Sequence, residues 1–145
     1  MCWPEDEIRD WLMAAADNTG CSVEMLPGDE EDAIVARLFS KYVNEIRNPG
    51  SWWMGLKLPY ECFHRTEKKI SDVLPSLDGI VHLLPEAPRL AFVYRIKAVE
   101  LETILDNCPG FEYVVASEDG SWLMTENHHD MFYLCKAADR EMLEG

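Results

Sequence analysis

The densest group of chemically active side chains lies between Glu126 and Asp130, where the chain reads ENHHD. Carboxylate and imidazole groups are common metal ligands and common acid–base groups in hydrolytic enzymes. However, consecutive side chains on a strand point to opposite faces, so His128 and His129 cannot easily bind one ion from a regular strand. The helical spacing of the two histidines in zinc proteases is also absent. The segment therefore allows two interpretations: a polar turn between two strands, which is favoured, and a small metal-binding or hydrolytic enzyme that uses the His128/His129 region.

The turn interpretation has a local physical basis. Asn127 can adopt left-handed backbone dihedral angles, and Asn or Asp side chains accept hydrogen bonds from neighbouring backbone amides. Other catalytic patterns are missing, because the sequence has no glycine-rich phosphate loop, no GxSxG elbow and no CxxC pair. The 5 cysteines are widely scattered, which indicates buried free thiols. We therefore expect no metal and no other cofactor.

The formal net charge of −14 is the strongest compositional feature. Its acidic excess lies in residues 1–50 and 111–145, whereas residues 51–110 are almost neutral. Such a field repels nucleic acid and anionic membranes, whose binding needs cationic side chains, and it attracts a basic protein. Solubility alone is the competing explanation, since a large net charge also keeps a protein in solution.

Two groups of acidic side chains could contact a basic partner. The first lies at the start of a predicted helix and consists of Asp29, Glu30, Glu31 and Asp32. The second lies near predicted turns and consists of Glu118, Asp119, Glu126 and Asp130. The second group is slightly favoured, because rigid strands hold turn residues in place, whereas acids at a helix start already stabilise the helix. Trp52 and Trp53 are neighbours in an extended segment and face opposite ways, so at most one of them can lie fully in the core. Core packing is the default, and an apolar anchor between these charges is the alternative.

Hydrophobic periodicity places these candidates on specific elements. Helical spacing is found in residues 4–17, in a second helix from Asp29 or Glu30 to about residue 46, and in residues 66–77 and 99–107. Residues 51–63 are expected to be irregular and extended, residues 80–84 and 90–96 to be strands, and residues 136–145 to form a last short helix. Residues 111–116, 122–125 and 131–135 predict a β-meander with an Asp-Gly turn. We therefore expect an α+β fold in which N-terminal helices pack on one face of a mostly antiparallel sheet that ends in a C-terminal β-meander.

The chain of 145 residues is expected to form a single domain with a packed core, because 48% of its residues are hydrophobic. No apolar segment approaches the roughly 20 residues of a membrane-spanning helix. The acidic N-terminus lacks the basic and apolar segments of a secretory signal. These features predict a cytosolic protein.

The segment FEYVVASEDGSWLMTENHHDMFYL, together with the tryptophan pair upstream, resembles a family of small bacterial proteins classed only as a domain of unknown function. Members share a pattern like FEYY–WL–ENHHD, and the resemblance covers roughly residues 50–135. The family has no established activity to transfer, but its size and acidity are similar to those of bacterial immunity proteins. The resemblance therefore implies a protein that neutralises a cognate toxin by occluding its basic active site. An acidic accessory subunit without a toxin partner is a further alternative.

Overall fold

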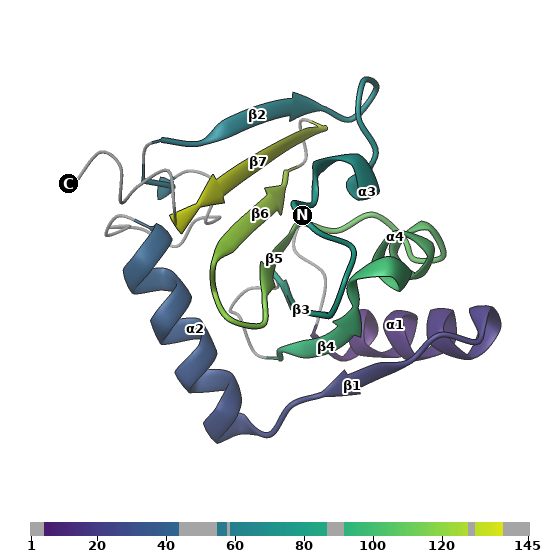
Figure 1. The fold of residues 1–145 in the computed structure, drawn as a ribbon. Coiled ribbons are helices and arrows are strands. Elements are labelled where there is room, and N and C mark those ends of the chain that lie inside the picture. The colour runs from purple at the N-terminus through teal and green to yellow at the C-terminus, as the bar shows by residue number, and fades with distance from the viewer. Residues whose placement is uncertain (1–4, 44–54, 58, 87–91, 128–129, 138–145) are drawn as a thin grey trace.

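The computed structural model describes residues 5–43, 55–57, 59–86, 92–127 and 130–137. In these residues it contains four helices and a seven-stranded, fully antiparallel sheet, which confirms the predicted α+β class (Figure 1). The helices are α1 (Glu5–Thr19), α2 (Gly28–Tyr42), α3 (Ile70–Val73) and α4 (Ala98–Asp106). The strands are β1 (Val23–Met25), β2 (Glu61–His64), β3 (Ile80–Pro85), β4 (Tyr94–Lys97), β5 (Tyr113–Ser117), β6 (Trp122–Glu126) and β7 (Met131–Lys136).

The predicted meander forms part of this sheet. The strand order is β1-β4-β3-β5-β6-β7-β2, so β5, β6 and β7 are neighbours in space as they are along the chain. The register pairs Tyr113 with Glu126 across β5 and β6, and Glu126 with Phe132 across β6 and β7. Strand β1 was not predicted, because a three-residue strand is too short to show an alternating pattern.

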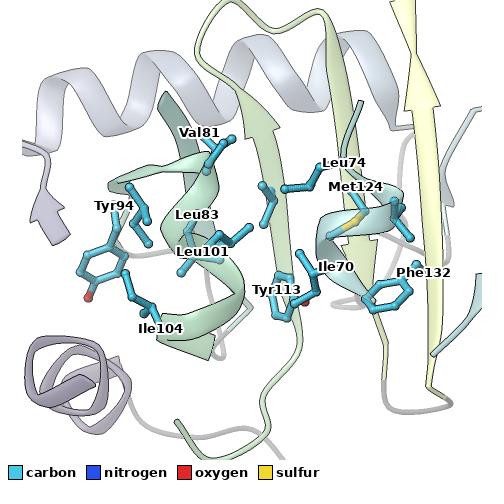
Figure 2. Close-up of a cluster of buried hydrophobic side chains, with 14 of the residues drawn as sticks. Ile70, Leu74, Val81, Leu83, Tyr94, Leu101, Ile104, Tyr113, Met124 and Phe132 are labelled. Carbon is cyan, nitrogen blue, oxygen red and sulfur yellow. The ribbon is translucent and has the colours of Figure 1, made fainter. Parts of the chain in front are cut away.

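Helices cover both faces of the sheet, so the expectation that they lie on one face is wrong. Along β5, Tyr113 and Val115 belong to one buried cluster, whereas Val114 and Ala116 belong to another. The first cluster lies between the sheet and helices α1, α3 and α4, and Figure 2 shows much of it. The second lies between the sheet and α2. Alternate side chains of one strand supply both clusters, which is why β5 and β6 are almost entirely apolar.

Two predicted helices are shorter in the structure than their patterns indicated. Helix α2 ends at Tyr42, and Val43 adopts an extended conformation that forms an isolated bridge with Leu56. The helix predicted over residues 66–77 is reduced to α3, which ends at Val73 because Leu74 is extended before Pro75, as expected of a residue that precedes proline. The predicted C-terminal helix, apart from the start of its range, lies outside the described residues.

Trp122 is buried on β6, as expected, with only 6% of its surface exposed. Phe111 was also expected on a paired strand, but it precedes β5 and packs half-buried against the first cluster, where its ring stacks on Trp11. None of the helices that the structure describes is long and apolar enough to cross a membrane.

Candidate functional site

The turn between β5 and β6 is held against α2 by hydrogen bonds. The Tyr42 hydroxyl donates to the carbonyl oxygen of Gly120 over 2.6 Å, and Lys41 Nζ donates to the same oxygen over 3.1 Å. Arg37 Nη2 donates to the carbonyl oxygen of Glu118 over 3.3 Å. The turn and α2, which are about eighty residues apart in sequence, therefore form one continuous surface.

Both carboxylates of this turn already have partners within the chain. One Asp119 carboxylate oxygen accepts hydrogen bonds from Ser117 Oγ at 2.7 Å and from the backbone N–H of Ser121 at 3.0 Å. These bonds favour the charged form and lower the pKa of Asp119 to about 2. Glu118 forms an ion pair with Arg95 Nη2 at 2.7 Å. The turn acids that the sequence favoured as partner contacts are thus engaged in holding the fold.

The acids at the start of α2 divide into exposed and buried side chains. Glu31 is only 7% exposed, because it faces the protein rather than the solvent. Asp29, Glu30 and Asp32 are exposed, and none of them forms an ion pair with a described residue. These three are the side chains of the first group that remain available to a partner.

The structure brings members of the two acidic groups together. Glu30 and Glu118 line the same shallow hollow of about 350 Å³, together with Arg37, Arg95 and His82. Arg95 also forms a weaker ion pair with Glu24 on β1, at 3.4 Å. We call the three exposed acids at the start of α2, Asp29, Glu30 and Asp32, the α2 acidic surface. The two groups that appeared as alternatives in the sequence therefore meet at Glu30 and Glu118.

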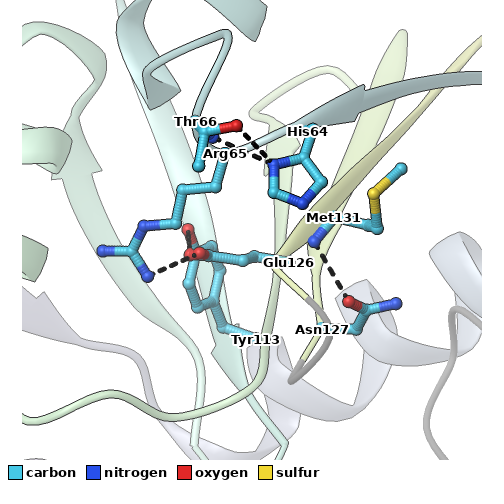
Figure 3. Close-up of polar contacts among 7 residues, drawn as sticks. All are labelled: His64, Arg65, Thr66, Tyr113, Glu126, Asn127 and Met131. Carbon is cyan, nitrogen blue, oxygen red and sulfur yellow. Dashed lines mark hydrogen bonds and ion pairs between the residues drawn. The ribbon is translucent and has the colours of Figure 1, made fainter.

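Glu126 and Asp130 lie at the opposite end of β6 from this surface. Glu126 is the last residue of β6 and is 8% exposed. It is therefore a buried acid and, contrary to what the sequence had suggested, does not belong to an exposed acidic surface. Its carboxylate accepts a hydrogen bond from the Tyr113 hydroxyl at 2.6 Å and forms an ion pair with Arg65 Nη1 at 3.0 Å (Figure 3). Burial raises the pKa of Glu126, the charges of Asp130 and Asp106 raise it further, and Tyr113 and Arg65 partly offset the shift.

The ENHHD segment crosses from β6 to β7, and its described residues agree with the polar-turn interpretation. The backbone of Asn127 pairs with Met131, and Asn127 Oδ1 accepts a hydrogen bond from the Met131 N–H at 3.2 Å. Among the described residues of this segment, the left-handed one is Asp130, with φ of 59°, and not Asn127 as predicted. Asn127 instead continues the ladder beyond Glu126 and uses its side chain as the cap.

A cavity of about 590 Å³ lies beside Glu126. It is bounded by the end of α4, the loop that leads into β5, the ends of β5 and β6, and the residue that follows β2. Its lining residues are Arg65, Ile70, Leu105, Asp106, Cys108, Pro109, Gly110, Phe111, Glu112, Tyr113, Glu126, Asn127 and Asp130. The cavity thus combines apolar walls with several carboxylates and one guanidinium group. Burial raises the pKa of the Cys108 thiol to about 11, so this cysteine is a neutral part of the wall.

Sequence reasoning missed Tyr113 and Arg65, the two partners of Glu126. Tyr113 could have been found, because a hairpin closed around the Asp-Gly turn places it directly opposite Glu126. Arg65 gives no such signal, since it comes from the far side of β7, where it follows β2.

Four candidate residues, Trp52, Trp53, His128 and His129, lie outside the described residues. Within the residues that the structure does describe, no group of three His, Cys, Asp or Glu side chains is arranged to hold a metal ion. The chain matches no protein-family model, no curated protein and no solved structure. The resemblance drawn from its sequence pattern therefore stays a prediction.

Proposed function

We propose that this chain is a cytosolic immunity protein that binds a cognate toxin and occludes its basic active site with an acidic surface. The observation that carries the proposal is the α2 acidic surface. There Asp29, Glu30 and Asp32 are exposed without an ion pair to any described residue, on a chain of net charge −14. The neighbouring turn acids are engaged internally, which moves the preferred contact from the turn to the start of α2.

The physics of association supports such a role. A toxin that acts on nucleotides or nucleic acids needs a basic site, and a rigid acidic surface is attracted to it over long range. The hydrogen bonds from Tyr42 and Lys41 to Gly120 fix the turn to α2, so little order has to be gained on binding. Trp52 and Trp53 remain candidates for an apolar anchor beside the charges, as the sequence suggested.

The direct test is protection of cells. Expression of a secreted toxin candidate encoded beside the gene should stop growth, and co-expression of this chain should restore it. The double variant Glu30→Lys/Asp32→Lys should lose protection and should slow association with the toxin, most strongly at low salt, because screening removes the attraction. Asp17→Lys is the matched control, since Asp17 is exposed on α1, on the opposite face of the sheet. Equal protection by both variants, with a flat salt dependence, would remove the α2 acidic surface from the mechanism.

A hydrolytic role for the His128/His129 region is the second candidate. One observation favours it: Asn127 and Asp130, which flank the histidines, line the cavity that also contains Glu126, a carboxyl group of raised pKa. A carboxyl group whose pKa is raised by burial is a candidate for proton transfer. Elemental analysis that finds about one zinc or iron per chain, lost in His129→Ala, would support this candidate over the first.

A further inference from the structure

The cavity beside Glu126 has the size and composition of a small-molecule site. Its volume of about 590 Å³ falls in the usual range for ligand pockets. Ile70, Leu105 and Phe111 give it apolar walls, and Phe111 lies edge-on to Tyr113 with 6.0 Å between the ring centroids. Aromatic rings beside carboxylates attract cations through both the ring quadrupole and the charge.

Glu126 has acceptor capacity left over. An ionised carboxylate offers about four lone-pair positions. Among the described residues, Glu126 receives one hydrogen bond on each oxygen, from Tyr113 and from Arg65. Only 10% of the Glu126 side chain is exposed, and it lines the cavity. A donor inside the cavity would complete its hydrogen bonding.

The acids of the cavity occupy positions that cost stability. Asp106 is the last residue of α4, where the helix dipole disfavours a negative charge. Asp130 adopts a left-handed conformation, and Glu126 is a buried carboxyl group. The charges of Asp106 and Asp130 both act on Glu126, because each of them raises its pKa. A bound cation would relieve this repulsion, and nothing among the described residues except Arg65 supplies one at the cavity.

Arg65 shows which cation the site accepts. Its guanidinium group stands 3.0 Å from Glu126 Oε2, yet 56% of its side chain is exposed. The carboxylate is therefore already in a geometry that binds a guanidinium group, and the resident group is not fixed there by burial.

From these observations we propose that the cavity bounded by α4, β5 and β6 binds an organic cation, an ammonium or guanidinium group on an apolar stem, with Glu126 and Asp106 as its charged contacts. The inference does not depend on the proposed function. The same chemistry is offered by a free small amine and by a lysine or arginine side chain of a protein partner.

The experiment is an NMR titration of the full chain with n-pentylamine and n-butylguanidine, with n-pentanol as the neutral control. The cations should shift amide signals in residues 105–108 and 110–113 and at Glu126 and Asp130, whereas pentanol should not. Equal shifts with pentanol would make the cavity an apolar pocket only and would overturn the proposal, as would the absence of any shift with either cation.

Three variants and one control then assign the contacts. Glu126→Gln keeps an acceptor for Tyr113 but loses the charge, so it should weaken binding about tenfold. Asp106→Asn should also weaken binding, by a smaller factor. Arg65→Gln should strengthen binding, because it removes the competing guanidinium group. Asp17→Asn changes an exposed acid of α1 that does not line the cavity, so it should leave affinity unchanged and reports any general effect of net charge. Circular dichroism confirms that each variant is folded, and Asp106→Asn, at an exposed helix end, keeps the test valid if Glu126→Gln fails to fold.

A loss of binding in Arg65→Gln, or unchanged binding in both Glu126→Gln and Asp106→Asn, would overturn the assignment. The source of the cation follows from competition. If pentylamine competes with a partner protein obtained by the protection assay, a side chain of that partner occupies the cavity. If it binds without competing, the occupant is a free small molecule. Failure of the protection assay leaves the titration intact, so the two proposals can fail separately.

Discussion

The two ends of β6 carry acids that look alike in the sequence and differ in the structure. At the β5–β6 turn, Asp119 is exposed and accepts hydrogen bonds that lower its pKa to about 2. At the other end, Glu126 is buried, and burial raises its pKa in spite of Tyr113 and Arg65. The fold stabilises the charge of the first acid and is destabilised by the charge of the second.

This difference separates two kinds of functional candidate. An acid such as Asp119, whose charge is needed by its own turn, has a sufficient structural reason to be present. A buried acid such as Glu126 is harder to explain by stability, because an apolar or amide side chain would serve as well or better there. Positions that oppose stability are where a ligand site is expected. The α2 acidic surface is intermediate, with exposed charges that are neither satisfied nor costly.

The largest expected effect is on stability, and it tests whether the two ends of β6 unfold together as one cooperative unit. Trp122→Ala removes a buried indole and should lower the free energy of unfolding by about 3 kcal/mol or more. Hydrogen exchange should then accelerate at both turns. Val99→Ala is the control, because Val99 is 63% exposed, and it should change stability little. An unchanged denaturation midpoint for Trp122→Ala would mean that the two ends cannot be compared as parts of one strand.

A matched pair of hydroxyl deletions should distinguish the two ends. Tyr113 and Tyr42 each donate a hydrogen bond of 2.6 Å, the first to the Glu126 carboxylate and the second to the Gly120 carbonyl oxygen. Tyr113→Phe should cost about 1.5–3 kcal/mol at neutral pH, because the acceptor is charged, and Tyr42→Phe about 1 kcal/mol. The cost of Tyr113→Phe should shrink on acidification as Glu126 is protonated, whereas that of Tyr42→Phe should not. Chemical denaturation at several pH values measures both, and equal, pH-independent costs would contradict the contrast.

The fold was more predictable than the site, for physical reasons. The meander follows from residues 111–135 because short β-rich apolar runs and an Asp-Gly turn between them are local signals. The sequence does not show which face of the sheet each helix covers, because β5 and β6 bury side chains on both faces and could be covered from either side. Burial of Glu126 and the position of Arg65 depend on strand β2 pairing with β7, which the chain's local pattern does not encode. The exposed acids of α2 were found from sequence, but their junction with the β5–β6 turn was not.

Opposite pH dependences should also separate the two acids. The folded pKa of Glu126 lies above its ordinary value of 4.5, so its stabilising contribution is present in acid and is lost as pH rises through the folded pKa. Glu126→Gln should therefore gain stability relative to the wild type as pH rises. The folded pKa of Asp119 lies below its ordinary value of 3.8, so its contribution is present above that value and is lost as pH falls toward about 2. Asp119→Asn should thus be least stable, relative to the wild type, above pH 3.8. Thermal unfolding across this pH range measures both differences, and a common sign would refute the contrast.

The smallest expected effect is the most specific to function. Asp106 and Glu100 stand at opposite ends of α4, where the helix dipole disfavours the first charge and favours the second. Asp106→Asn should raise the free energy of unfolding by about 0.3–1 kcal/mol, and Glu100→Gln should lower it by a similar amount. The Gln side chain keeps an acceptor for the Ser22 amide, so the difference reports the charge. If Asp106 had only a structural role, Asp106→Asn would change stability without changing ligand binding. If Asp106 serves the cavity beside Glu126, the same Asp106→Asn variant that unfolds at higher denaturant concentration should bind n-butylguanidine more weakly. Gain of stability without loss of binding would show that the charge of Asp106 has no part in the cation site.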